Sequence, residues 1–413
     1  MRRILFLIVL LTLVTPITSF AADNLKEMFK NGTIKGEIRY RDFARNYDDS
    51  SRDRADSAFG GLFYYKTDSL YGITLGSSFL TSTDLNSSDS KNVYGLLKKD
   101  ENGNHDSYTK LGEFYVQGSW FDTTIKAGSQ ELHTPFANVY DFRMSPRLYK
   151  GVSILNKSVA GLELQAFYIT KFMQLNDTEF IPISEAFKSS VDDDKPLIIA
   201  SAKYTLPTSI IDKLTVQAWT YNMPDVYRLN YFRTDYKKKM NEILVCNFRL
   251  DYITQGDIGD GLAGEFDTDQ YGFMTGFEAY GLRFDVAYSK TGDDNLSIPF
   301  GDSLIVAQAP GGAYRAEEDA YLARAMYNFA HVGAKGLVAY IDHAYYDTPD
   351  SGENASFDIN ETDFNVNYAF SGFMDGFSLR FRYAYINTDE DLGGVDHYDI
   401  RYYATYKFTF GGK

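Results

Sequence analysis

Apolar and polar residues alternate with a period of two along most of this chain, and no other feature constrains its fold as strongly. In the last such segment one face carries Tyr402, Ala404, Tyr406, Phe408 and Phe410, and the other carries Arg401, Tyr403, Thr405 and Lys407. The same alternation runs through residues 377–385 and 34–41. A period of two indicates β-strands, in which successive side chains point to opposite faces.

The alternation predicts 18 strands, most of them about ten residues long, as a tilted strand needs to cross a membrane. They begin near residues 33, 57, 71, 109, 122, 148, 160, 197, 212, 226, 242, 269, 280, 319, 334, 360, 376 and 396. Connections after even-numbered strands are mostly short, as at Ser69-Leu70, Trp120-Phe121, Ser158-Val159 and Ala279-Tyr280. Those after odd-numbered strands are mostly long and polar (82–108, 129–147, 172–196, 291–318 and 346–357), with a short exception at 223–226. Transmembrane barrels show this asymmetry between periplasmic turns and outer loops.

Strands with one apolar and one charged face can form a barrel in lipid, with the apolar side chains outward. Open edges would leave backbone groups unsatisfied in hydrocarbon, so the sheet must close. Sixteen to eighteen strands enclose an aqueous channel. The 33 Tyr and 31 Phe residues, many at strand ends, suit the aromatic girdles of such barrels. The sequence predicts an all-β, transmembrane antiparallel barrel; a soluble all-β adhesin is the alternative.

The N-terminus predicts export. Arg2 and Arg3 precede the apolar run 4–14 and a small-residue end at Ala21, which is the pattern of a secretory signal peptide. We expect cleavage after Ala21, with Ala22 as the alternative site. The run is too short for a membrane anchor, the other interpretation, and Pro16 interrupts it. Residues 1–21 are thus predicted to be the signal peptide and 22–413 a single barrel domain.

Charge and motifs argue against several functions. The formal net charge of −15 disfavours nucleic-acid binding, and a single cysteine, Cys246, excludes an intramolecular disulfide. The five histidines show no metal-ligand spacing, and no nucleophile elbow or phosphate loop is present. We expect no enzyme activity, no cofactor and no metal.

Four stretches resemble the OprD-like outer-membrane porins, the substrate-selective channels best known from pseudomonads. They are residues 29–39, 134–146 with Gly151, 219–228, and 376–385 with the final strand. Because these stretches cover the chain end to end, the resemblance implies one 18-stranded barrel narrowed by inward-folded loops. One departure is that Gly411, Gly412 and Lys413 follow Phe410, whereas such barrels usually end on an aromatic residue.

The predicted register points eight basic residues into the lumen: Arg39, Arg41, Lys126, Arg249, Arg283, Arg324, Arg380 and Arg382. The resemblance implies a basic ladder down one wall, which Arg380 and Arg382 match best. Arginine suits this role because its fork binds a carboxylate in two places and stays charged. The alternative interpretation is that these charges only hydrate a wide lumen.

Two long loops are the candidate constriction elements. The first, 129–147, holds His133, Asp141, Arg143 and Arg147, and the second, 291–318, holds Asp302, Ser303 and Tyr314. The resemblance implies that both fold into the barrel, although the sequence alone is equally compatible with exposed loops. The loops also carry two short acidic stretches, Asp48-Asp49 and Asp192-Asp193-Asp194. We interpret them as solvated loop charge; the alternative is that they bind divalent cations that bridge lipopolysaccharide.

The sequence therefore predicts passive diffusion of small water-soluble solutes, with amino acids or small carboxylates as the expected class. A general, non-selective porin and a surface adhesin without a transport role are the alternatives. The expected partners are these solutes, outer-membrane lipid and lipopolysaccharide, and the barrel assembly machinery. The pattern does not distinguish a monomer from a homotrimer.

Overall fold

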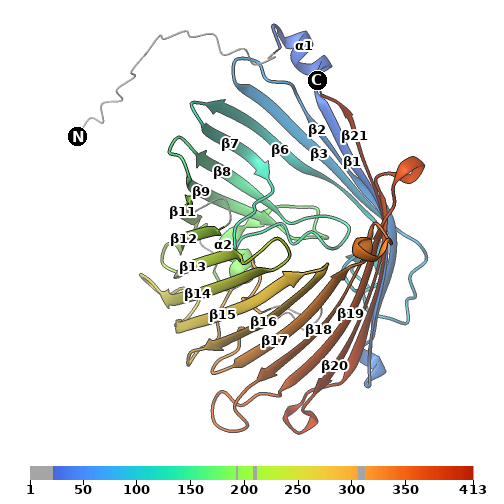
Figure 1. Ribbon diagram of the computed structural model, residues 1–413, viewed down its shortest axis with the longest axis vertical. Helices are drawn as coiled ribbons and strands as arrows, with labels where there is room; N and C mark the ends of the chain where they lie inside the picture. Colours follow the sequence, from blue (N-terminus) through green and yellow to red (C-terminus); the bar gives the residue numbers. More distant parts are fainter. Residues whose placement is uncertain (1–21, 192–193, 208–211, 306–311, 413) are drawn as a thin grey trace.

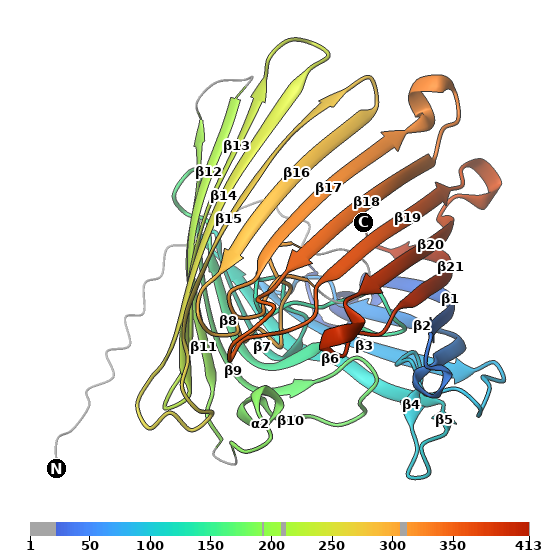
Figure 2. The same cartoon turned by 90° about the horizontal axis from the view of Figure 1, so that it is seen from below.

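The computed structural model describes residues 22–191, 194–207, 212–305 and 312–412, and forms a closed antiparallel barrel (Figures 1 and 2). Its wall consists of β1 (Thr33–Tyr47), β2 (Arg54–Lys66), β3 (Ile73–Asp84), β6 (Tyr108–Trp120), β7 (Thr123–Gln130), β8 (Leu148–Asn156), β9 (Leu162–Met173), β11 (Leu197–Pro207) and β12 (Asp212–Met223). It continues with β13 (Tyr227–Lys239), β14 (Val245–Asp257), β15 (Asp267–Ala279), β16 (Leu282–Thr291), β17 (Asp319–Asn328), β18 (Leu337–Asp347), β19 (Ile359–Ala369), β20 (Phe377–Thr388) and β21 (His397–Gly411).

Each wall strand pairs with its neighbours along the chain, and β1 closes the barrel by pairing with β21 over its full length, from Thr33↔Gly411 to Tyr47↔His397. Shorter elements lie in the connections: α1 (Leu25–Lys30), α2 (Ile183–Phe187), β4 (Lys98–Lys99), β5 (His105–Asp106), β10 (Ile181–Pro182) and 3-10 turns at Ser50–Arg52, Phe329–Val332, Gly372–Met374 and Glu390–Leu392. No helix in the described part of the chain is both long and apolar enough to span a membrane.

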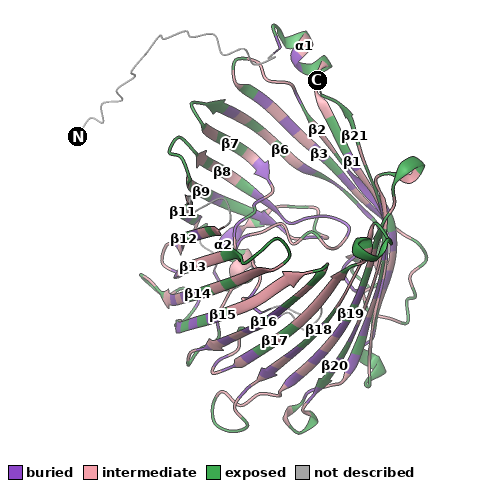
Figure 3. Ribbon diagram, viewed as in Figure 1, coloured by how far each residue is buried: buried purple, intermediate pink, exposed green. Residues whose placement is uncertain are grey.

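The predicted barrel with 18 strands is confirmed, and each strand begins within three residues of its predicted start. The two faces of the strands also follow the predicted register. On β21, Tyr402 and Tyr406 point outward and are half exposed, whereas Arg401 and Tyr403 point inward and are buried. Figure 3 shows this alternation as bands of buried and exposed residues along the strands.

The short turns at one end of the barrel fit the geometry of tight β-hairpins. Phe121 and Asp122 connect β6 to β7, and both have positive φ (48° and 57°). Tyr280 and Gly281 connect β15 to β16 with φ of 50° and 81°. Two consecutive positive φ values define the two-residue turn whose twist matches the flanking strands. We assign this end to the periplasm and the long-loop end to the cell exterior.

One part of the wall departs from the expected apolar-out, polar-in pattern. The inward side chains of β11 to β14 include Ile199, Tyr221, Tyr231 and Ile253, all fully buried in one apolar cluster. The expected charged face therefore covers only part of this wall: on β14, Arg249 and Asp251 point inward, but Ile253, nearer the exterior, lies in the apolar cluster. The physical reason is that inward-folded loops cover the exterior part of the wall, so its inner face there is a protein core.

Two expectations fall on residues outside the described part of the chain. These are the signal peptide, residues 1–21, and the acidic residues Asp192 and Asp193. Immediately after residue 21, the chain is packed against the periplasmic end of the barrel. The Ala22 amide donates a hydrogen bond to the Ser69 carbonyl (2.8 Å), and the Tyr65 hydroxyl donates one to the Phe29 carbonyl (2.5 Å).

Candidate functional site: the lumen and its inward-folded loops

The inner faces of β20, β21 and β1 bring three arginines close together around Tyr403. Arg380 and Arg41 lie opposite Tyr403 on its two neighbouring strands, and their guanidinium carbons lie 5.6 and 4.8 Å from the centre of its ring. Arg382 lies one inward position further along β20, opposite Arg401. An aromatic face attracts a cation, so Tyr403 can hold two guanidinium groups in place. We call Arg41, Arg380 and Arg382 the basic cluster.

None of the basic cluster forms an ion pair with a carboxylate in the described residues, and their hydrogen bonds are to neutral groups. Arg41 donates to the Thr405 hydroxyl (2.9 Å), and Arg380 donates to the Asn365 amide oxygen (3.2 Å) and the Tyr340 hydroxyl (3.2 Å). The Nε of Arg382 is buried without a hydrogen-bond partner among the described atoms. Arg41 is only 6% exposed, whereas Arg380 and Arg382 are partly exposed. The latter two are the members that a solute can reach.

The other five basic residues that we predicted to face the lumen do so, but each is paired with a carboxylate. Arg39 bridges Asp141 and Glu37, with N–O distances of 2.6 Å to each. The remaining pairs are Arg249–Asp251 (2.7 Å), Arg283–Asp285 (2.6 Å), Arg324–Asp342 (2.6 Å) and Lys126–Glu113 (3.8 Å). Among the eight predicted residues, the basic cluster is therefore the set without carboxylate partners in the described part of the chain, and the other five are locally neutralised.

The loop 131–147 folds into the barrel and packs on the apolar wall. Phe136 contacts Tyr221 and Tyr231 edge-on, with ring centres 5.7 and 5.1 Å apart. At the far side of the lumen, Asp141 receives two hydrogen bonds from Arg39 (2.6 and 2.8 Å). The loop thus crosses from the apolar wall to the strand that carries Arg41.

The other predicted residues of this loop have different surroundings. Arg143 donates to the Gly95 carbonyl (3.5 Å), and burial lowers its pKa. Arg147 donates to the Gln174 side chain (3.0 Å), and its guanidinium carbon lies 4.4 Å from the centre of the Tyr140 ring. His133 is exposed. The loop therefore places two arginines against neutral groups and leaves its histidine at the surface.

The second loop, described over 292–305 and 312–318, meets the first inside the barrel through residues 300–302. The backbone N–H of Asn138 donates to the Phe300 carbonyl (2.9 Å), and its side chain donates to the Asp302 carboxylate (3.0 Å). Burial raises the pKa of Asp302, against the effects of the Asn138 bond and the Arg147 charge. Gly301 allows this approach, because a Cβ there would lie 2.4 Å from the Phe136 Cα. Ser303 is buried and donates to the Ile305 carbonyl (3.0 Å), while Tyr314 is half exposed.

A third loop, 85–107, also folds inward, and our sequence reasoning missed it. The Asp56 carboxylate on β2 accepts the backbone N–H groups of four successive residues, Tyr94 to Leu97, at 2.6 to 3.2 Å. The Tyr94 hydroxyl reaches Asp399 and accepts a hydrogen bond from Arg401 (3.0 Å). An apolar run, Val93 to Leu97, inside a polar loop was the available signal. Exposed loops rarely carry such a run, because it gains stability only by burial.

Lys110 is a further residue that sequence reasoning did not single out. It points inward from β6 and is 4% exposed. Its Nζ donates to the carbonyls of Leu175 (2.8 Å), Asp177 (2.9 Å) and Gln174 (3.1 Å). Three carbonyls satisfy all three donors of an ammonium group. Lys110 thereby fixes a fourth inward segment, 174–177, beside the first loop.

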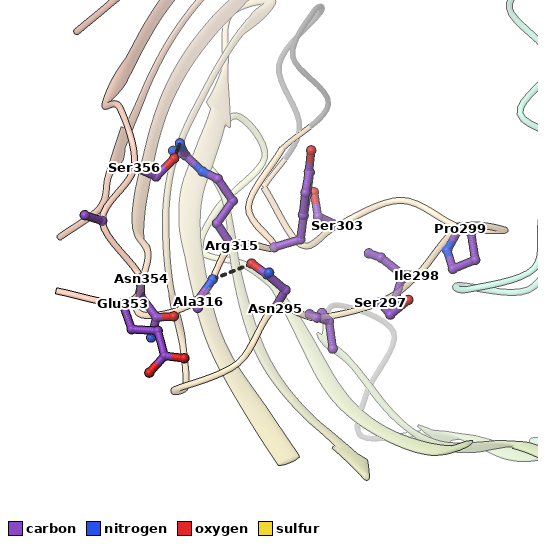
Figure 4. Close-up of a pocket in the computed structure, with 14 residues that line it drawn as sticks. Asn295, Ser297, Ile298, Pro299, Ser303, Arg315, Ala316, Glu353, Asn354 and Ser356 are labelled. Atoms are coloured by element: carbon purple, nitrogen blue, oxygen red, sulfur yellow. Dashed lines mark hydrogen bonds between the residues drawn. The ribbon is translucent and has the colours of Figure 1, made fainter. Parts of the chain in front are cut away.

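A hollow of about 700 Å³ lies at the exterior end, between the second loop and residues 353–356 (Figure 4). Arg315 borders it and donates to the Ser356 hydroxyl (3.3 Å), and the Ala316 amide donates to the Asn295 side chain (2.8 Å). Within the described residues, no three His, Cys, Asp or Glu side chains are grouped to hold a metal ion. The lumen as described offers hydrogen bonds and charge to a solute.

Comparison with known proteins identifies the family. The family model "outer membrane porin, OprD family" matches residues 29–410. The fold is that of Pseudomonas aeruginosa OccK9 (OpdG), with a TM-score of 0.83 and 19% identity over 93% of this chain and 100% of that one. Acinetobacter baumannii OccAB3 has a TM-score of 0.82 and 18% sequence identity, over 92% of this chain and 100% of that one. P. aeruginosa OpdK, solved with vanillate, has a TM-score of 0.81 and 18% identity, over 93% of this chain and 100% of that one. No curated protein sequence matches the chain. Because the family model spans nearly all of the sequence, the chain belongs to the OprD family of outer-membrane porins, which are passive channels and not enzymes.

Proposed function

We propose that this outer-membrane porin selects small solutes that carry a carboxylate. The observation that supports the proposal is the basic cluster, where Arg380 and Arg382 lack a carboxylate partner in the described residues and are partly exposed to the lumen. A guanidinium binds a carboxylate with two parallel hydrogen bonds, which a neutral sugar cannot reproduce. The paired arginines cannot act equally well, because a solute would first have to displace a protein carboxylate.

Transport requires that this binding be weak. A channel site must attract the solute enough for entry and still release it quickly. Arg382 is partly exposed and has no ion pair among the described residues, so it gains a charge-assisted hydrogen bond when a carboxylate arrives. Water and the neighbouring neutral groups can replace the solute when it leaves. OpdK, which has the same fold, was crystallised with vanillate, an aromatic carboxylate, and this supports the proposed class.

Liposome swelling tests the proposal. Purified, refolded protein is compared for entry of a small carboxylate and a neutral sugar of similar size. We expect faster entry of the carboxylate, and we expect the double variant Arg380→Ala/Arg382→Ala to reduce that preference by about tenfold or less, since a charge-assisted hydrogen bond contributes about 1.5–3 kcal/mol and transport uses only part of it.

Arg283→Ala is the matched control, because Arg283 also lines the lumen but is paired with Asp285. It should leave the preference nearly unchanged. Equal entry of both solutes into wild-type liposomes would instead indicate a general porin, and an absence of conductance would indicate an adhesin. If Arg283→Ala abolished the preference as fully as the double variant does, total lumen charge would be the cause and not the basic cluster.

We infer that residues 1–21 are removed after export. Ala22 is buried, and its amide donates a hydrogen bond to the Ser69 carbonyl. A signal peptide that stayed attached would have to leave the barrel from this buried residue, and this supports cleavage after Ala21. The mass of the mature protein tests this, and cleavage one residue later would lower it by one alanine. Lipopolysaccharide and the barrel assembly machinery are the partners that we propose for a barrel in this membrane, as a monomer or a homotrimer.

A further inference from the structure

The geometry points to a second solute site in the exterior mouth of the barrel, which takes a small carboxylate with an apolar, hydroxyl-bearing body. This site is a cavity of about 280 Å³, close to the lower limit for pockets that bind small molecules. It lies between the exterior ends of β1, β18, β19, β20 and β21, and residues 312–315 of the second inward loop cover it. It adjoins the hollow of Figure 4, since Tyr314 and Arg315 border both.

The floor of the cavity is apolar. Ile359 and Ile386 point inward from β19 and β20 and are almost fully buried, and Phe357 packs against the same cluster. Val395 and the ring of Tyr47 complete the apolar lining. A cavity with such walls favours a solute with a hydrocarbon or aromatic body over a fully hydrated ion.

His397 and Arg315 line the cavity beside this floor, and each has a side-chain nitrogen without a hydrogen-bond partner among the described atoms. His397 is 8% exposed, and its Nδ1 lies 3.0 Å from the Val395 carbonyl, which can only accept a hydrogen bond. Nδ1 therefore carries the proton, and in the neutral ring Nε2 is an acceptor. Nε2 is buried and has no partner among the described atoms. The Nη2 of Arg315 is likewise buried and unpartnered there.

Two arginines supply the attraction for a carboxylate. Arg52 forms no ion pair with the described residues, and its guanidinium carbon lies 4.9 Å from the centre of the Tyr47 ring. Arg315 is held by Glu318 and by the Phe357 carbonyl (2.6 Å), which leaves Nη2 available. The third arginine of the lining, Arg45, is neutralised by Asp399 (2.8 Å). The arrangement thus offers guanidinium donors to a carboxylate and the His397 acceptor to a hydroxyl group.

Unsatisfied buried polar groups are rare in folded proteins and usually have an explanation. Small rotations of the His397 and Arg315 side chains toward a ligand in this cavity would give Nε2 and Nη2 the partners that they lack among the described atoms. Its place in the mouth, before the basic cluster, would raise the local concentration of the solute at the entrance. This inference rests on the proposed function for its carboxylate, but it concerns a different set of residues.

Equilibrium binding by calorimetry on the purified full-length barrel in detergent tests the site. The probes are 4-hydroxybenzoate, benzoate and the neutral 4-hydroxybenzyl alcohol. We expect affinity to fall in this order. His397→Phe should weaken 4-hydroxybenzoate by about threefold to tenfold, the net value of one hydrogen bond, and leave benzoate unchanged. Arg52→Gln should weaken both carboxylates and leave the alcohol unchanged.

Matched controls separate the site from general effects. Val395→Trp, which fills the cavity from a loop, should abolish binding of all three probes, whereas Val332→Trp on an exposed periplasmic turn should not. Arg54→Gln, next to Arg52 but outside the cavity, should bind like the wild type.

The basic-cluster double variant distinguishes this inference from the proposed function. If Arg380→Ala/Arg382→Ala loses selective transport but retains binding, both ideas stand. If selective transport is absent in the wild type but cavity-dependent binding remains, only the proposed function fails. No binding by the wild type, or binding that depends on Arg380 and Arg382 and not on Val395 and Arg52, would overturn the mouth site.

Discussion

Two walls of the lumen share one strand geometry and present opposite chemistry. On β20, β21 and β1 the inner face carries the basic cluster, and Arg380 and Arg382 are partly exposed there. On β12 and β13 the inner face carries Tyr221 and Tyr231, both fully buried under Phe136. The difference shows how a barrel of this size can be narrowed asymmetrically. Apolar burial anchors the loops on one wall, and the opposite wall keeps charged groups for the solute.

The largest expected effect comes from removing the anchor on the apolar wall. Phe136→Ala should cost about 3–5 kcal/mol of loop docking, because a buried aromatic ring is lost from a packed cluster. Single-channel recording should then show a larger and noisier conductance, and residues 131–147 should become sensitive to protease. The barrel itself should keep its heat-modifiable migration on a detergent gel. Phe114→Ala, on the outward face, is the control. Unchanged conductance in Phe136→Ala would mean that polar contacts alone hold the loop.

The strands and their faces could be predicted from the sequence, because alternation follows directly from strand geometry and burial in lipid. The ends of the strands are less well predicted. The alternation of apolar and polar residues extends back to Leu244, but the hydrogen-bonded pairing of β14 with β13 begins at Val245. The inward placement of Arg380 and Arg382 followed from the same register. Their lack of carboxylate partners did not, because Arg324 has the same pattern and yet pairs with Asp342 on the next strand. Such pairing depends on relative register between strands, which one sequence does not reveal.

The loops were the harder part of the prediction. The resemblance implied that 129–147 and 291–318 fold inward, and residues of both, such as Phe136, Asn138, Phe300 and Asp302, meet inside the barrel. The clamp on Tyr94 to Leu97 was missed because its acceptor, Asp56, lies on another strand about forty residues earlier and is indistinguishable from a solvated aspartate. Long-range hydrogen bonds to backbone groups leave no local pattern, so only the apolar run itself could have indicated burial.

A second prediction sets a paired arginine against an unpaired one. Arg324→Gln should destabilise the barrel by about 3 kcal/mol, because it leaves the Asp342 carboxylate, 1% exposed, without its partner. Arg382→Gln should change stability by less than about 0.5 kcal/mol, the range of substitutions that break no buried pair. Urea unfolding in detergent, followed by tryptophan fluorescence, measures both. Equal midpoints for the two variants would contradict the division of the lumen arginines into two sets.

The smallest effect concerns a carboxyl group at the start of the first inward loop, which crosses from the apolar wall to the side of the basic cluster. Glu131, which follows the last residue of β7, accepts a hydrogen bond from Tyr64 (2.6 Å). Burial raises the pKa of its carboxyl to about 7, aided by the charges of Glu113 and Asp141 and opposed by the Tyr64 bond. The folded state thus favours the protonated acid. The contribution of the protonated Glu131 carboxyl to the stability of the folded state is complete below the ordinary pKa of 4.5, and it is lost as the pH rises towards 7.

Ionisation of Glu131 between pH 6 and pH 8 adds one negative charge to the lumen. We therefore expect the ratio of cation to anion permeability, obtained from reversal potentials across a salt gradient, to be modestly higher at pH 8 than at pH 6. Glu131→Gln should remove this change, whereas Glu179→Gln, in an exposed part of the fourth inward segment's loop, should retain it. Because one charge is added to a lumen that holds many, the effect should be smaller than that of the double arginine variant. If Glu131→Gln keeps the full pH dependence, the carboxyl group that titrates in this range lies elsewhere in the channel.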